Sequence, residues 1–215
     1  MTDFVTQANS ERFNSIAASW DDNPVRSGIA RGVAGAILER IAPTGRERAL
    51  EFGAGTGLVT ALLSPSLRSV VAADNATGML AILRLKADEL GLTNVEPCEA
   101  DLSKAVPGGP FDLIFSSMTL HHIEDIPALL ARLAASLSPG GRVALADLES
   151  EDGTFHGEVA GVMHHGFDLQ TFSGWLRDAG FTDIDIRRAH VVHKTGADGR
   201  AHDYPVFLAL ARLGG

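Results

Sequence analysis

The segment that most constrains the fold is residues 48–57, in which a short apolar run ends in an acid and is followed by closely spaced glycines. It predicts a strand, a tight turn and the start of a helix over residues 58–63. Gly53, Gly55 and Gly57 let the backbone bend sharply and approach a ligand closely, because no Cβ is present to clash. The segment therefore predicts a ligand-binding loop between a strand and a helix.

The spacing of these glycines indicates the kind of ligand. They follow the pattern G-x-G-x-G, and Leu58 stands where the dinucleotide fingerprint G-x-G-x-x-G needs a small residue, which argues against NAD. A second apolar run, residues 69–73, brings Asp74 to the carboxyl end of a strand about 20 residues after Gly53. A carboxylate placed there can accept hydrogen bonds from both hydroxyls of a ribose. The sequence thus predicts a cofactor that contains a nucleoside.

Strand and helix patterns alternate from residue 48 onward, which predicts an α/β fold with a parallel sheet and helices on both faces. The predicted strands are 48–52, 69–73, 94–98, 111–117 and 142–147, and the predicted helices are 56–63, 76–90, 127–137 and 169–179. The tail adds strands at about 182–192 and 204–212, joined by the turn Gly196-Ala-Asp-Gly199.

Four blocks occur in order along this pattern: Leu50–Gly57, Ala73–Asn75, Glu99–Leu102 and Phe111–His122. Together they resemble the motifs of the class I (Rossmann-like) S-adenosylmethionine-dependent methyltransferases, and the resemblance covers most of the chain from Arg48 onward. In that family they are the first motif, the ribose acid, the adenine contact and the fourth strand with its exit. The resemblance implies a three-layer αβα sandwich with a seven-stranded, mostly parallel sheet and an antiparallel C-terminal edge hairpin. It also implies an enzyme of the small-molecule type.

The resemblance further implies S-adenosyl-L-methionine as the cofactor and a set of residues that bind it. That set is Glu51, Gly53, Ala54, Gly55, Gly57, Asp74, Asn75, Met79, Asp101, Leu102, Ser116 and Ser117. Met79 lies on the apolar stripe of a helix, so it packs either on the adenine or in the core. Asp101 either accepts a hydrogen bond from the adenine amino group or caps a turn.

Two helical patterns precede the first strand, within residues 1–47. Relatives in the resembled family use such a pair as a cap over the cofactor, so Phe13 and Trp20 are expected to line the site and Trp20 to meet the substrate. The alternative is that both aromatic rings pack on the edge of the sheet. As a cap, residues 1–26 should gain protection when the cofactor binds, because short helices bury little surface by themselves.

Histidines gather in two segments near the carboxyl end of the predicted sheet. His121 and His122 follow the fourth strand, and His156, His164 and His165 lie in the long connection 148–167, which we interpret as a substrate-side insertion. An alcohol, phenol or protonated amine must lose a proton before methylation, and histidine is suited to accept it, whereas a thiolate needs no base.

The predicted catalytic residues are His122 and His165, followed by His121, which is alternatively turned into the core. His156 and His164 are predicted to contact the substrate. His156, His164 and His165 could also join Asp147 and Glu149 around a metal ion, or simply form the polar rim of a cleft. Because the sequence has no recognised ligand spacing, we predict no metal.

Composition limits the partners that this chain can have. A length of 215 residues with 45% apolar content suits one domain, residues 1–215. A net charge of −9 without a basic cluster argues against nucleic acid or an anionic membrane, and so favours a small-molecule substrate. Cys98 has no partner for an internal disulfide, and the first residues lack the features of a signal peptide, so a cytoplasmic location is expected. The alternatives to a methyltransferase are a non-catalytic S-adenosylmethionine-binding module and, with less support, a NAD-dependent oxidoreductase. The sequence indicates neither the acceptor nor the oligomeric state.

Overall fold

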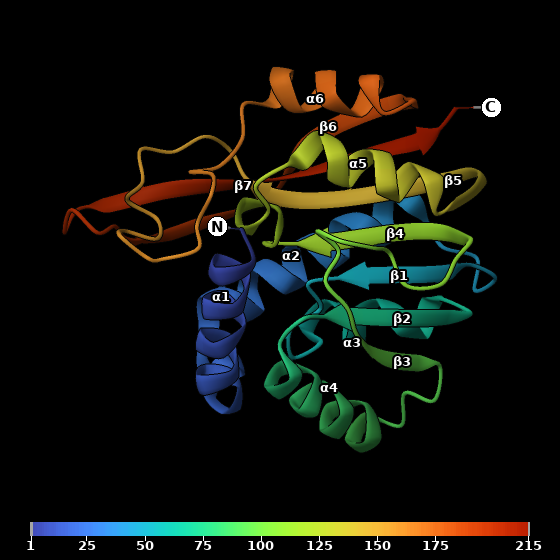
Figure 1. The fold of residues 1–215 in the computed structure, drawn as a ribbon, viewed down its shortest axis with the longest axis horizontal. Helices are drawn as coiled ribbons and strands as arrows, with labels where there is room; N and C mark the ends of the chain where they lie inside the picture. The colour runs from blue at the N-terminus through green and yellow to red at the C-terminus, as the bar shows by residue number, and fades with distance from the viewer. Residues whose placement is uncertain (1, 215) are drawn as a thin grey trace.

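The computed structural model describes residues 2–214, with side chains described from residue 9 onward. Its centre is a seven-stranded sheet in the order β3-β2-β1-β4-β5-β7-β6 (Figure 1). The strands are β1 (Arg48–Phe52), β2 (Ser69–Asp74), β3 (Val95–Glu99), β4 (Phe111–Ser117), β5 (Leu137–Leu148), β6 (Phe181–Thr195) and β7 (Ala201–Leu213). Strands β1 to β5 are parallel, and β7 runs antiparallel to both β5 and β6. The predicted α/β fold class is confirmed.

Strand order reverses between β1 and β4, which are neighbours although two strands separate them in the sequence. In open α/β sheets, ligands bind outside the carboxyl ends of the strands at such a switch point. The glycine loop that follows β1 and the histidine pair that follows β4 therefore open onto the same place.

The helices are α1 (Thr2–Ile16), α2 (Pro24–Ile41), α3 (Leu58–Leu63), α4 (Thr77–Leu90), α5 (Ile126–Ala135) and α6 (Leu169–Asp178), with short 3-10 turns η1 (Ala17–Asp22), η2 (Ser64–Ser66) and η3 (Leu120–His122). The predicted helices are confirmed to within about two residues at each end. Asp125 and Asp168 cap α5 and α6 by accepting hydrogen bonds from Ala128 N and Thr171 N.

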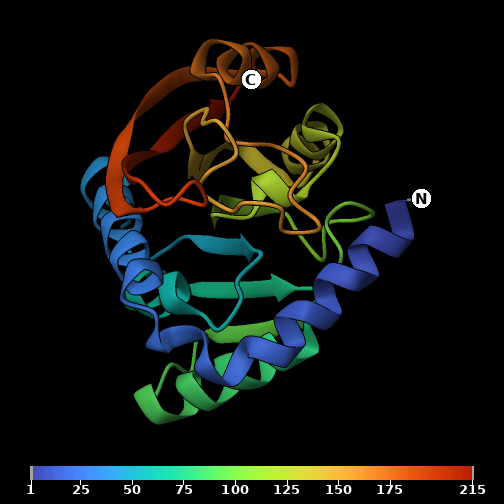
Figure 2. The same cartoon turned by 90° about the vertical axis from the view of Figure 1, so that its left-hand side faces the viewer.

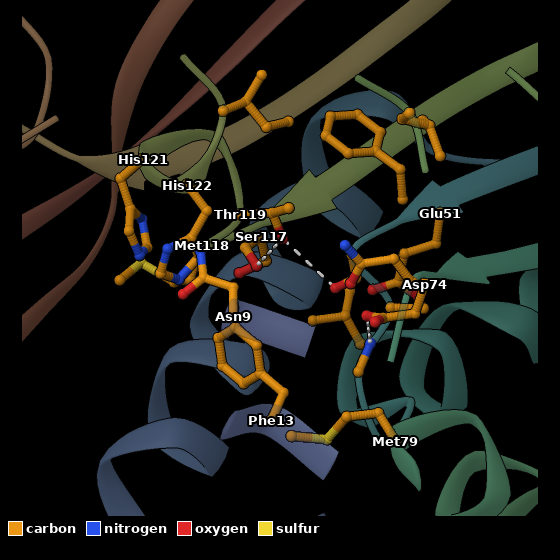
Figure 3. A pocket seen from close by; sticks show the side chains of 18 of the residues that line it. Asn9, Phe13, Glu51, Asp74, Met79, Ser117, Met118, Thr119, His121 and His122 are labelled. Carbon is orange, nitrogen blue, oxygen red and sulfur yellow. Dashed lines mark hydrogen bonds between the residues drawn. The ribbon is translucent and has the colours of Figure 1, made fainter. Parts of the chain in front are cut away.

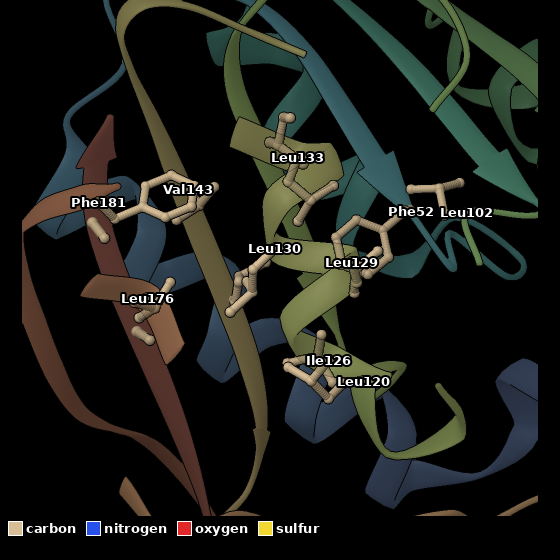
Figure 4. Close-up of a cluster of buried hydrophobic side chains, with 14 of the residues drawn as sticks. Phe52, Leu102, Leu120, Ile126, Leu129, Leu130, Leu133, Val143, Leu176 and Phe181 are labelled. Carbon is tan, nitrogen blue, oxygen red and sulfur yellow. The ribbon is translucent and has the colours of Figure 1, made fainter. Parts of the chain in front are cut away.

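The core lies on both faces of the sheet, because successive residues of a strand point to opposite sides. Ile114 of β4 belongs to the cluster on the side of α5 and α6. Leu129 of α5 and Leu176 of α6 are fully buried in that cluster (Figure 4). Its neighbours Leu113 and Phe115 point to the opposite side of the sheet, where they share a cluster with Val33 of α2 and with residues of α3. This two-sided burial is the reason that the middle of β4, residues 113–115, is apolar without alternation.

The C-terminal hairpin is longer than predicted, since β6 reaches Thr195 and β7 begins at Ala201. The Gly196–Gly199 turn joins them as expected, with Gly199 N donating to Gly196 O at 3.0 Å. Strand β5 also begins earlier than predicted, because Leu137 pairs with Phe111 ahead of a shift in register. Within the described part of the chain, no helix is both long and apolar enough to cross a membrane.

Helix α1 crosses the carboxyl ends of the parallel strands (Figure 2). Hydrogen bonds fix it on two sides of that edge. Ser10 Oγ donates to Asn75 O at 3.0 Å after β2, and Asn9 Nδ2 donates to Gly161 O at 3.1 Å in the connection that follows β5. The N-terminal helix and the 148–167 connection thus meet over the same end of the sheet.

Candidate active site

A cavity of about 700 Å³ opens at the carboxyl ends of the parallel strands, under α1 and beside the 148–167 connection. This volume is typical of sites for small molecules. Glu51 and Asp74 lie toward one end of the cavity, and His121, His122 and Asn9 toward the other (Figure 3). We call these the carboxylate end and the histidine end.

The glycine loop forms part of the carboxylate end. Gly53 has φ +62° and lies so close to Thr119 that an added Cβ would overlap that side chain. Gly55 has φ +55°, and a Cβ there would meet no atom within 4 Å, so its backbone faces open space in the cavity. The loop is therefore bent, and it leaves room for a ligand directly against the main chain.

Most residues of the predicted cofactor set line the cavity. They are Glu51, Gly53, Ala54, Gly55, Asp74, Asn75, Met79, Asp101, Leu102 and Ser117. Two do not. Gly57 begins α3 with φ +80° and packs against Leu83, so it shapes the turn from outside the cavity. Ser116 is fully buried and donates its hydroxyl to Phe52 O at 2.8 Å, because side chains alternate along β4 and its neighbour Ser117 takes the cavity side.

Asp74 is held rigidly at the end of β2. Its Oδ2 accepts from Gly55 N and its Oδ1 from Ala76 N, each at 2.8 Å. Burial raises the pKa of Asp74 by more than these backbone donors lower it. Each carboxylate oxygen keeps a further lone pair, so Asp74 can still accept from a ligand.

Glu51 is fully enclosed in β1, which is uncommon for an acid, and its carboxyl accepts a hydrogen bond from the hydroxyl of Thr60. Burial, with a smaller effect from the charge of Asp74, raises the pKa of Glu51 to about 8. At neutral pH the carboxyl therefore carries a proton.

The exit of β4 brings histidines together. Met118 adopts a left-handed φ of +58° and turns the chain into η3. His121 is buried, with its Nδ1 at 2.8 Å from Oδ1 of Asp147 at the end of β5. Burial alone would raise the pKa of Asp147, but the facing His121 ring and the backbone N–H groups of His121 and Leu148 outweigh it and lower the pKa. This pair fixes the orientation of the His121 ring.

His122 lies over His121, with ring centroids 4.1 Å apart. Its Nδ1 lies 2.7 Å from Gly161 O, and because a carbonyl oxygen can only accept, Nδ1 carries the hydrogen and Nε2 is left with a free lone pair. Burial lowers the pKa of His122 to about 4, with His121 and Arg12 acting in the same direction. His122 is therefore neutral at physiological pH.

His156 completes the histidine end from the 148–167 connection, with its ring centroid 4.5 Å from that of His121. Burial, His121 and His122 lower the pKa of His156 to about 3. Despite this gathering, no group of three or more His, Cys, Asp or Glu side chains in the described part of the chain is arranged to hold a metal ion.

Two histidines predicted for the site lie elsewhere. The side chain of His165 is 55% exposed, its Nδ1 lies 3.5 Å from Glu151, and it does not line the cavity. The Nε2 of His164 lies 2.9 Å from Ile123 O, and its ring packs on Phe167. Both depart from the prediction, because the connection folds back on β5 through Glu149 and Phe167 and so turns these side chains away.

Phe13 and Trp20 both line the cavity, as expected for a cap. Their ring centroids lie 5.6 Å apart, and Phe13 also meets His122 edge-on at 5.4 Å. Three polar residues, Asn9, Arg12 and Arg26, line the cavity beside them and were not predicted from the sequence. Arg12 directly precedes Phe13 in the sequence, but no motif marks it as a site residue.

The fold and the site together define a Rossmann-like α/β protein with a glycine loop, a carboxylate at the end of β2 and a cavity that joins them to a histidine cluster. The profile of the family described as "Methyltransferase domain" matches residues 26–186. The chain belongs to this family and is a class I S-adenosylmethionine-dependent methyltransferase.

Individual relatives agree with that assignment. An uncharacterized methyltransferase of Schizosaccharomyces pombe is 27% identical, over 86% of this chain and 82% of its own. A ubiquinone biosynthesis O-methyltransferase of Xanthomonas axonopodis pv. citri is 28% identical, over 84% of this chain and 82% of its own. Among solved structures, the complex of DhpI with SAH superposes with a TM-score of 0.75 at 24% identity, covering 98% of this chain and 97% of the other, which supports the fold.

Proposed function

We propose that the protein holds S-adenosylmethionine at the carboxylate end of the cavity and transfers its methyl group to an oxygen or nitrogen of a small-molecule acceptor bound at the histidine end. In this proposal residues 1–215 act as one domain. Residues 1–47 form the cap over the cofactor, and residues 148–167 cover the acceptor.

The residues at the carboxylate end fit this cofactor. Open space against Gly55 leaves room for it beside the main chain, and Asp74 would hold the ribose hydroxyls. Met79 and Leu102 offer nearly buried apolar surface to the adenine.

Arg26 would pair with the carboxylate of the cofactor's amino-acid part. Its guanidinium stacks 3.6 Å from the centroid of the Trp20 ring. It lies next to Asp21, whose Oδ1 accepts a hydrogen bond from Thr56 of the glycine loop at 2.6 Å. These contacts put a cation beside the loop that faces the cofactor.

When bound, the cofactor supplies an electrophilic methyl group on a sulfonium, which passes to a nucleophile as the carbon–sulfur bond breaks and its electron pair stays on sulfur. The protein's part is to exclude water and to align the acceptor. Orientation of this kind can supply roughly 7–11 kcal/mol of the barrier. The cap aromatics Phe13 and Trp20, together with Phe155, enclose the cavity for that purpose.

The observation that carries the proposal is the hydrogen bond from His122 Nδ1 to Gly161 O. It supports a neutral ring whose Nε2 accepts the proton of an alcohol, phenol or ammonium acceptor, while the acceptor's freed electron pair forms the new bond to carbon. The proton then passes from His122 to solvent. His121 lies beneath this ring and is held by Asp147, so we assign it a positioning role.

The test is a screen of small phenols, alcohols, amines and thiols for formation of S-adenosylhomocysteine by the wild-type protein. With an oxygen or nitrogen acceptor, His122→Ala should lower kcat by roughly 10²–10⁴-fold. Calorimetry should find the affinity for S-adenosylmethionine nearly unchanged. The acidic limb of kcat/KM for the wild type should lie near pH 4, the pKa of His122, and well below the pKa of a free histidine.

His165→Ala is the matched control, since this histidine is exposed outside the cavity, and it should keep full activity. Equal activity of His122→Ala and the wild type on an oxygen or nitrogen acceptor would refute the base. Turnover of thiols alone, with His122→Ala fully active, would indicate a sulfur acceptor that needs no base. Cofactor binding without turnover of any acceptor would favour a non-catalytic module.

A further inference from the structure

The histidine end of the cavity holds two polar atoms that are buried and have no hydrogen-bond partner: Arg12 Nη1 and His156 Nδ1. Native proteins satisfy nearly all buried polar groups, since an unmet donor loses its water without compensation. Two such atoms in one ligand cavity indicate that a ligand completes their hydrogen bonding.

Arg12 lies close to Phe13 and influences two other groups that line the cavity. Its guanidinium lies 5.3 Å from the centroid of the Phe13 ring, which in turn meets His122 at 5.4 Å. The positive charge of Arg12 contributes to the low pKa of both His122 and Arg26. Arg12 therefore lies near both the proposed base and the cation that we assign to the cofactor.

Among the described residues, the acid whose charge acts on this pair of cations is Asp21, which lies near Arg26. In the described structure neither Arg12 nor Arg26 forms an ion pair with a carboxylate. Asp21, the acid nearest to Arg26, pairs with Lys86 at 2.6 Å and accepts from Thr56. In a chain with net charge −9, two neighbouring arginines without acidic partners are an unusual arrangement.

The cofactor carries a single carboxylate, and its sulfonium and ammonium groups add positive charge. One arginine suffices for that carboxylate, and Arg26 is linked to the glycine loop through Asp21, which accepts a hydrogen bond from Thr56. Arg12 is then left for a second anion at the histidine end.

Lys194 is the other cation near this end, and its charge reaches His156. Its Nζ already donates to Phe155 O at 2.5 Å, it stacks 3.8 Å from the centroid of that ring, and it faces the acid Glu151. Lys194 is therefore more fully satisfied than Arg12.

From this arrangement we infer that the methyl acceptor carries an oxyanion, a carboxylate or a phosphate, which binds to Arg12 and to the ring N–H of His156. The inference rests on the proposed function, because it names the acceptor that the histidine end receives. A guanidinium binds either anion through paired N–H donors, so the shared chemistry is that of a small acidic acceptor.

The first test is direct binding to the complex with S-adenosylhomocysteine. Inorganic phosphate, phenyl phosphate and benzoate are titrated by calorimetry, with potassium chloride at matched ionic strength and benzamide as controls. We expect saturable binding of at least one anion and none of benzamide. Arg12→Gln should weaken anion binding by roughly 10–100-fold, and Arg12→Lys should weaken it by less. The control is Arg31→Gln, because Arg31 is an exposed residue of α2, and it should change anion binding by no more than twofold. Preference for phosphate or for benzoate decides between the two sources of the anion.

The second test separates an acceptor site from a cofactor contact. S-adenosylhomocysteine and 5′-methylthioadenosine, which lacks the carboxylate, are compared on Arg12→Gln and Arg26→Gln. Arg26→Gln should weaken only the first ligand, by roughly tenfold or more, and Arg12→Gln should leave both within about threefold. If Arg12→Gln weakens S-adenosylhomocysteine but not 5′-methylthioadenosine, Arg12 is a cofactor ligand and the inference is wrong.

The third test measures turnover. Each phenol, alcohol and amine of the screen is supplied as a carboxylic acid and as the matching primary amide, and the acids should show at least tenfold higher kcat/KM, with the difference lost in Arg12→Gln. The inference would be wrong if the amides were turned over as efficiently as the acids, or if no anion bound more tightly than chloride. Either result would leave the proposed methyl transfer intact. Failure to bind S-adenosylhomocysteine at all would instead refute the proposed function. Thermal unfolding of each variant distinguishes loss of the site from loss of the fold.

Discussion

We expect the charge of Glu51 to change when the cofactor binds. It lies buried at the end of β1, next to Asp74, and its pKa of about 8 keeps it protonated in the free protein at neutral pH. A cationic cofactor at this end of the cavity favours the ionised carboxyl. Cofactor binding at pH 7 should therefore release a proton.

We predict that the binding enthalpy of S-adenosylmethionine at pH 7 differs between phosphate and Tris buffers, because the buffer takes up the released proton. The difference should vanish above about pH 9, where Glu51 is already ionised, and affinity should rise as the pH increases toward 8. Calorimetry measures both. Glu51→Gln has no proton to release, so a buffer-dependent enthalpy that persists in this variant would assign the proton to another group.

Among the described residues, the cap and the 148–167 connection meet in a short contact between Asn9 and Gly161. Asn9 is buried and donates to Gly161 O, the same oxygen that fixes the tautomer of His122. Gly161 has φ +86°, and an added Cβ would overlap Asn9, so the side chain of Asn9 lies directly against the main chain of Gly161. The position of helix α1 is thereby coupled to the orientation of the proposed base.

Asn9→Ala should loosen this junction. One hydrogen bond is worth about 1 kcal/mol, so amide exchange over residues 10–24 should quicken roughly fivefold in the free protein, and bound S-adenosylhomocysteine should restore part of the protection. Hydrogen exchange with mass spectrometry is the measurement. Ser19→Ala is the control, because Ser19 is exposed and bonds only within its own turn. Exchange in Asn9→Ala that equals that of the control would mean that the cap is held by its apolar contacts alone.

For the whole molecule, the neutral histidines of the site make stability depend on pH. Folding lowers the pKa of His122 from an ordinary value near 6.5 to about 4. Between these two pH values the unfolded chain binds a proton at His122 that the folded protein does not bind. The stability from this group is present above pH 6.5 and is lost as the pH falls toward 4. His156 acts in the same direction. Glu51 acts oppositely, since its raised pKa costs stability as the pH rises from about 4.5 to 8.

Urea unfolding at pH 7 and pH 5 should therefore show a smaller loss of stability in His122→Asn than in the wild type, by about 2 kcal/mol. The contribution of Glu51 is common to both proteins and cancels in the comparison. His165→Asn should lose as much stability as the wild type, because His165 is exposed outside the cavity. Parallel curves for His122→Asn and the wild type would contradict a depressed pKa at His122.

The α/β sheet, the glycine loop and the position of Asp74 could all be predicted from the sequence. These features depend on local physics: the apolar period of a strand or helix, the freedom of Gly53 and Gly55 at positive φ, and the rule that an acid ending a parallel strand lies at the ligand edge. Such patterns lie within a few residues of each other, so they are visible before folding. The predicted strand boundaries were therefore nearly correct, apart from β5 and the C-terminal hairpin, which depend on pairing with other strands.

The set of polar side chains that share the cavity depends on long-range packing and could not be predicted in this way. His122 and His156 face it, whereas His164 and His165 do not, because the connection is folded back by bonds to β5 and to residues far away in the sequence. Asn9 meets Gly161 across 152 residues. Arg12 is likewise brought beside His122 by the packing of α1 over the sheet edge. Contacts of this range are set by how whole elements pack, and no periodicity in the chain encodes them.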